Sequence, residues 1–101
     1  MCGWKMHFDL KMNLIDDKPY LLTCLNEEAA EIIQDGCKAQ RFGLDSDYAG
    51  EKNSDKLITE LNQLVAVADL LFPEGWQNDQ IQDNKKDKLE QYYKINPLHH
   101  S

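Results

Sequence analysis

The chain has 101 residues, of which 42% are hydrophobic and 29% are charged, and its formal net charge is −7. These values fit one soluble globular domain over residues 1–101, and the acidic balance disfavours binding to a nucleic-acid polymer, whose phosphates it would repel. The sequence contains neither an apolar run of roughly 18 residues nor the pattern of a signal peptide. We therefore expect no membrane partner and a cytoplasmic location.

The first half of the chain is predicted to form one long helix. Residues 1–17 show no clear period but carry apolar side chains that can dock on the domain. Pro19 favours a helix start, because proline is tolerated in the first turn. Apolar residues then recur every three or four positions, which predicts an amphipathic helix over about 20–40. Gly36 either weakens this helix or lets another group approach closely, and Gly43 marks its end.

The second half is predicted to form two more helices. The polar residues 44–53 indicate a loop, and Asn53 and Ser54 are both good N-caps for a helix that runs to about Phe72. The second half of that helix, LVAVADLL, is apolar nearly all round, which suits a central helix of a bundle or an oligomer interface. A polar third helix over about 78–94 should lie on the surface. We expect an all-α antiparallel helical bundle with three main helices, a short N-terminal segment and no strands.

Three cysteines, Cys2, Cys24 and Cys37, form no CxxC motif, and their number is odd. A disulfide framework or a structural zinc site is therefore disfavoured. We expect Cys24 and Cys37 to pack as small apolar side chains.

Two groups of acidic residues stand at helical spacing. Glu27 and Glu28 each share a helix face with Glu31, and carboxylates placed so close repel one another unless a cation is present. Mg²⁺ prefers such oxygen ligands, although a solvated helix face is the commoner explanation of this pattern taken alone. Glu60 lies in an otherwise apolar stretch, and either a cation or an ion pair with Lys56, one turn earlier, could account for it.

A family resemblance links these groups. The chain carries, in order, Glu27-Glu28-x-x-Glu31, Lys38-x-x-Arg41-Phe42-Gly43, an asparagine-led helix with Glu60-x-x-Gln63, and a last helix with Lys85, Lys88, Leu89 and Tyr92. This order resembles the MazG-like branch of the all-α nucleotide pyrophosphohydrolases. The Lys38-x-x-Arg41-Phe42-Gly43 element, the asparagine-led start of the second helix and the lysine-rich last helix are typical of its small phage-type members. The resemblance covers about residues 19–95. The family pattern is EExxE, a variable gap and ExxD, and the gap of 28 residues is at the long end.

The resemblance implies a fold, an activity and a set of roles. The fold would be an antiparallel helical bundle that forms a homodimer or homotetramer. The activity would be hydrolysis of a nucleoside triphosphate to a monophosphate and pyrophosphate, with Mg²⁺ or Mn²⁺ as cofactor. The catalytic carboxylates would be Glu27, Glu28, Glu31 and Glu60. The last three would ligate metal together with position 63, and Glu27 would add a ligand or position the attacking water. The cations that balance the triphosphate would be Lys38, Arg41, Lys56 and Lys88.

Gln63 departs from the family pattern, which has Asp at this position. A glutamine carbonyl can bind Mg²⁺ but brings no negative charge. Asp69 lies about 180° around the helix from Glu60 and cannot substitute, and Asp35 faces the right way but is expected to sit too far along. Three outcomes follow: weaker metal binding with residual activity, a rearranged site, or a nucleotide binder without catalysis.

Three functional hypotheses therefore compete. The leading one is a Mg²⁺-dependent nucleoside triphosphate pyrophosphohydrolase, impaired to some degree by Gln63. The alternative is a non-catalytic module of the same fold that binds a nucleotide or a protein. The third is an acidic helical interaction protein whose carboxylates are only solvated.

Overall fold

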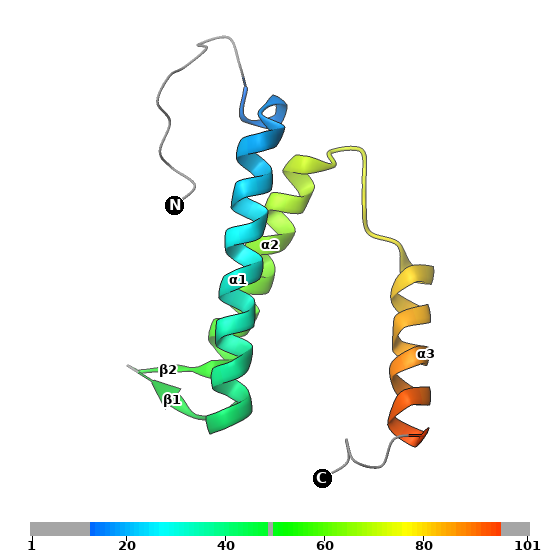
Figure 1. Ribbon diagram of the computed structural model, residues 1–101. Helices are drawn as coiled ribbons and strands as arrows, with labels where there is room; N and C mark the ends of the chain where they lie inside the picture. Colours follow the sequence, from blue (N-terminus) through cyan, green and yellow to red (C-terminus); the bar gives the residue numbers. More distant parts are fainter. Residues whose placement is uncertain (1–12, 49, 96–101) are drawn as a thin grey trace.

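The computed structural model describes residues 13–48 and 50–95, and Figure 1 shows the arrangement of their elements. Apart from one very short hairpin, the described chain is helical, which confirms the all-α prediction. The elements are a 3₁₀ turn η1 (Leu14–Asp16), helix α1 (Lys18–Phe42), strands β1 (Asp47–Tyr48) and β2 (Glu51–Lys52), and helices α2 (Asn53–Leu71) and α3 (Asp79–Ile95). The N-terminal segment that was expected to dock falls largely outside the described residues.

Helices α1 and α2 form an antiparallel pair, in which they lie side by side along most of their length (Figure 1). Asp17 caps α1 because its side chain accepts a hydrogen bond from the amide of Tyr20 at 3.3 Å. Gly43 ends α1 as predicted. Its φ of 97° lies in the left-handed region, and its amide donates to the carbonyl of Ala39 at 2.8 Å.

Side-chain hydrogen bonds fasten the helix pair at both ends. At one end the Lys18 ammonium donates to the carbonyls of Leu70 and Leu71 at 3.3 and 3.0 Å, which also places a cation at the C-terminus of α2. At the other end the buried Asn53 side chain donates to the carbonyl of Gly43 at 2.9 Å. The prediction that Asn53 caps α2 is therefore wrong, because its amide group reaches back to α1 instead.

The segment between α1 and α2 is not the simple loop that was predicted. Asp47 pairs with Lys52 and Tyr48 pairs with Glu51 in an antiparallel ladder of two residues per strand. Gly50 adopts a φ of 84° in the connecting turn, a conformation that glycine tolerates best. The hairpin is so short and polar that it leaves no alternating apolar pattern in the sequence.

The core of the single chain is small. Among the described residues, the buried hydrophobic side chains are Leu21, Cys24 and Leu71. Cys24 packs in this core as predicted, whereas Cys37 is exposed, so the prediction of a packed side chain was wrong there. Large apolar side chains remain exposed on both helices, for example Ile33 at 66% and Ile58 at 56%.

Helix α3 stands apart from the helix pair, so the chain by itself does not form a closed bundle of three helices (Figure 1). None of its side chains is buried, in agreement with the predicted surface location. Asn78 caps its first turn by accepting from the amide of Ile81 at 3.0 Å, and in the preceding loop Trp76 donates to Asp69 at 2.7 Å. None of the described helices combines the length and the apolar character that crossing a membrane requires.

Candidate metal centre

Three carboxylates from α1 and α2 meet between the two ends of the helix pair, where the side-chain hydrogen bonds of Lys18 and Asn53 join the helices. Glu28 and Glu31 lie one turn apart on α1, and Glu60 faces them from α2. One oxygen from each of the three groups lies within 4.8 Å of the others. The structure therefore brings together residues that are separated by a 28-residue gap in the sequence.

The cluster contains polar atoms that the described chain does not satisfy. Oε2 of Glu28 and Oε2 of Glu60 are buried and have no hydrogen-bond partner among the described residues. Buried carboxylate oxygens are normally paired or bound to a cation, because transfer from water to an unpaired site is costly. A solvated acidic face does not explain these two atoms.

The carboxyl groups perturb one another electrostatically. A hydrogen bond with Glu31, burial, and the charges of Glu31, Glu28 and Asp35 raise the pKa of Glu60 to about 7. Burial, followed by the charges of Glu31 and Glu27, raises the pKa of Glu28, although a hydrogen bond with Glu60 opposes this shift. Without a cation, the cluster thus relieves its repulsion by retaining a proton near neutral pH.

Asp35 is a fourth carboxylate on the same side of α1. It is only 5% exposed, and its Oδ2 is buried without a partner among the described residues. It lies outside the group of three whose oxygens come within 4.8 Å, yet its charge contributes to the raised pKa of Glu60. Sequence reasoning gave Asp35 no role because of its position along the helix, and its four-residue spacing from Glu31 was the signal that could have identified it.

The other predicted residues around the cluster differ in their exposure to solvent. Glu27 is half-buried beside Glu28, and Gln63 is exposed one turn beyond Glu60 on α2. Lys56 is also exposed, and no ion pair joins it to Glu60 in the part of the chain that the structure describes. The simple helix pair with Lys56 therefore does not account for Glu60.

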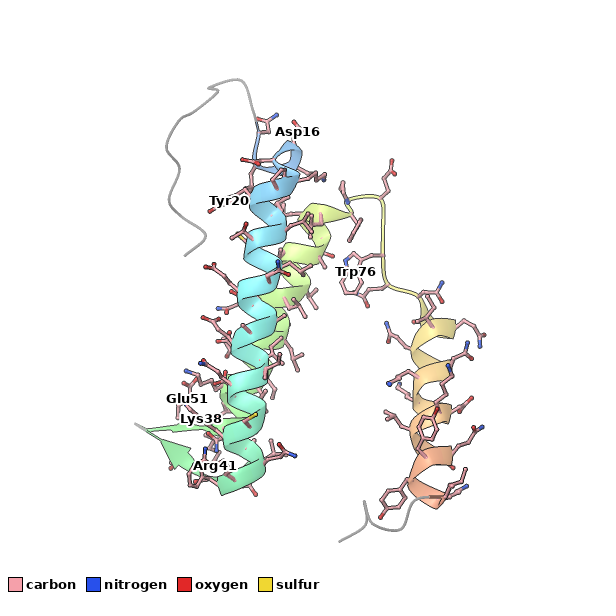
Figure 2. All side chains as sticks on the ribbon, viewed as in Figure 1. Asp16, Tyr20, Lys38, Arg41, Glu51 and Trp76 are labelled. Carbon is pink, nitrogen blue, oxygen red and sulfur yellow. The ribbon has the colours of Figure 1, made fainter. Side chains whose placement is uncertain are left out.

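Two of the predicted cations gather at the hairpin end of the molecule. Figure 2 shows Lys38 and Arg41 on the last turns of α1, next to β1 and β2. Together with Phe42 and Asn53 they line a pocket of about 380 Å³. Lys38 follows Glu31 by seven residues, which places it about 10 Å further along the helix axis.

The predicted cation Lys88 is not brought to the cluster within one chain. It is exposed on α3, which stands apart from α1 and α2 (Figure 1). A role for Lys88 at the cluster would require a second copy of the chain or a different placement of α3.

The donor set fits a small divalent cation. Oxygens bound to one Mg²⁺ lie about 3 to 4 Å apart, so small side-chain rotations would bring the three carboxylates into contact with one ion. All the donors are carboxylate oxygens, which Mg²⁺ and Mn²⁺ prefer over softer ligands.

Comparison of the chain with protein-family models, with curated proteins and with solved structures gives no match.

Proposed function

We propose that this protein is a Mg²⁺-dependent nucleoside triphosphate pyrophosphohydrolase of the MazG-like type. The observation that carries the proposal is the convergence of Glu28, Glu31 and Glu60 from two helices, with buried oxygens that lack partners. The order of motifs along the chain gives the reaction, because a cation site alone is compatible with many activities.

The carboxylates would divide metal binding and activation of the attacking water between them. Glu28, Glu31 and Glu60 would hold Mg²⁺ or Mn²⁺, which when bound supplies charge stabilisation for the phosphoryl oxygens. Glu27, half-buried beside Glu28, would accept a proton from the attacking water and orient it towards the α-phosphorus. Pyrophosphate would then leave with the electron pair of the bond between the α-phosphorus and the bridging oxygen.

The pocket at the hairpin end would bind the substrate. Lys38 and Arg41 would supply positive charge for the triphosphate at the hairpin end of α1, about 10 Å or more along the helix axis from Glu31. Phe42, also lining this pocket, presents a largely exposed ring with the Arg41 guanidinium 5.4 Å from its centroid. A nucleotide base could stack on this surface, which favours a nucleotide over a small phosphate ester.

We further propose that the active form is a homodimer or homotetramer. A single chain buries very few apolar side chains, while Ile33, Ile58 and Leu61 remain about half-exposed or more on the helix pair. A second copy would cover such surfaces. Light scattering after gel filtration should give at least twice the chain mass of 11.7 kDa, and a monomer at micromolar concentration would contradict this part of the proposal.

Gln63 supports a second candidate function, a nucleotide-binding module without catalysis. Its exposed amide carries no charge, so it gives Mg²⁺ less stabilisation than the Asp of the family pattern. Turnover distinguishes the two functions, because both predict cation-dependent nucleotide binding and the first alone predicts a product.

The decisive assay is pyrophosphate release from a panel of NTPs and dNTPs, with Mg²⁺, with Mn²⁺ and with EDTA. The variants are Glu31→Gln, Gln63→Asp and the control Glu74→Gln, which removes one exposed charge away from the cluster. We expect the wild type and the control to turn over with metal and Glu31→Gln to be inactive. An inert wild type with an active Gln63→Asp variant would favour the binding module, and inactivity of both would contradict the enzyme proposal.

A further inference from the structure

Asp35 is the most buried charged side chain in the described part of the chain, and the roles proposed above do not use it. It is 5% exposed, and its Oδ2 has no partner among the described residues. A carboxylate in such a position is normally paired with a cation or bound to a metal ion. The chain therefore retains a buried anionic group that needs a positively charged partner.

The position of Asp35 points to the cluster as the place of that partner. Glu28, Glu31 and Asp35 stand at positions i, i+3 and i+7 of one regular helix, within about 60° of each other around its axis. This face of α1 is the one that meets Glu60 of α2. Burial of Asp35 on a helix that packs against α2 places its side chain on the same side as the three converging carboxylates.

The side chain at position 63 is neutral, whereas the family pattern that the chain resembles has Asp there. Glu28, Glu31 and Glu60 bring three carboxylates, and Gln63 adds only an exposed amide. We propose that Asp35 supplies the fourth negative charge of the cation site, in place of an acidic residue at position 63. This inference rests on the proposed metal site. Mg²⁺ keeps several waters when it binds to proteins, so Asp35 can act as a ligand or as the acceptor for one of those waters.

The competing explanation is a purely structural role. Asp35 could pair with a basic side chain of a second copy of the chain, or it could accept a hydrogen bond from that copy in a closed interface. Either role would make Asp35 important for stability without metal, and neither would link it to the charge at position 63. If Asp35 belongs to the cation site, the metal-free protein does not need its charge for stability. An acidic residue at position 63 should then compensate for the loss of Asp35.

The test measures Mn²⁺ binding to the full chain by electron paramagnetic resonance. Binding is detected as a loss of the signal of free Mn²⁺. Asp35→Asn keeps the shape of the side chain and removes the charge, and Asp83→Asn removes an exposed charge on α3 as a matched control. We expect Asp35→Asn to weaken Mn²⁺ binding about tenfold or more and Asp83→Asn to have little effect. Adding Gln63→Asp to Asp35→Asn should restore most of the lost affinity.

Thermal unfolding in EDTA separates the cation site from a structural role. Without metal, Asp35→Asn should raise the Tm, because it removes an unpaired buried charge. A lower Tm would overturn the proposal, since it would show that Asp35 is paired within the fold or between copies. Wild-type Mn²⁺ affinity in Asp35→Asn, together with loss of binding in Glu31→Gln, would overturn the role of Asp35 and leave the proposed function standing. Absence of Mn²⁺ binding to the wild type would overturn both.

Discussion

Replacing Glu60 with Gln should make the metal-free protein more stable above pH 7. The hydrogen bond with Glu31, burial and the neighbouring negative charges raise the pKa of Glu60 from 4.5 to about 7 in the folded chain. Below pH 4.5 Glu60 is protonated in both the folded and the unfolded states and has no effect on stability. Between pH 4.5 and 7 the unfolded chain loses this proton first, so the stability of the folded state falls as the pH rises.

The shift sets the size of the effect. The rise of the Glu60 pKa from 4.5 to about 7 corresponds to at most about 3 kcal/mol in the free energy of unfolding. The folded state has lost this whole amount of stability once the pH is above 7. Solvent screening around the exposed Glu31 reduces this value to about 1–2 kcal/mol. Gln resembles the neutral form of Glu60 at every pH, so Glu60→Gln should match the wild type near pH 5 and exceed its stability by this amount at pH 8.5.

Urea unfolding in EDTA at fixed protein concentration, monitored by circular dichroism, measures the difference in stability between Glu60→Gln and the wild type. Glu74→Gln serves as the control, because it reports the general effect of removing one negative charge from a chain of net charge −7. With Mg²⁺ at 100 times its Kd, the wild type should gain about 2.7 kcal/mol and Glu60→Gln much less. A Glu60→Gln variant that is less stable than the wild type at pH 8.5 in EDTA would contradict the raised pKa of Glu60 in the folded chain.

Three further predictions concern other parts of the helix pair. Asn53→Ala should cost about 1–2 kcal/mol in urea unfolding because it removes the bond to the end of α1, whereas Asn62→Ala, which removes an exposed bond within α2, should cost less. Gly36→Ala should gain about 1 kcal/mol, because an added Cβ at Gly36 meets no atom within 4 Å, and a loss of stability would instead indicate that a second copy covers this face. Lys38→Ala and Arg41→Ala should each raise the KM for nucleoside triphosphate about tenfold or more, and an unchanged KM would exclude the hairpin pocket as the substrate site.

The sequence predicted the two long helices well, because the signals that mark a helix and its ends are local in the sequence. Apolar side chains recur every three or four residues, Pro19 and Gly43 mark the two ends of α1, and the structure places those ends within two residues of the predicted positions. The pairing of Glu60 with the carboxylates of α1 followed from the order of motifs. Local pattern alone could not show it, because the contact spans a 28-residue gap.

Features that depend on tertiary contacts were not predicted. Asn53 is a good N-cap by type. The carbonyl of Gly43 at the end of α1 lies within reach, however, and the Asn53 side chain donates its hydrogen bond there instead. The burial of Asp35 depends on how closely α2 approaches α1, a distance that spacing along one helix does not determine. The hairpin between the helices is too short to show a period, and nothing in the sequence of α3 indicated that it would stand apart from the pair (Figure 1).

The most direct test of the proposed activity is a phosphorus NMR spectrum of the wild-type protein after incubation with Mg²⁺ and a mixture of nucleoside triphosphates. We expect resonances of nucleoside monophosphate and pyrophosphate in equal amounts, and their absence when EDTA replaces Mg²⁺. Nucleoside diphosphate with inorganic phosphate, or an unchanged spectrum of the triphosphates, would contradict the proposed activity.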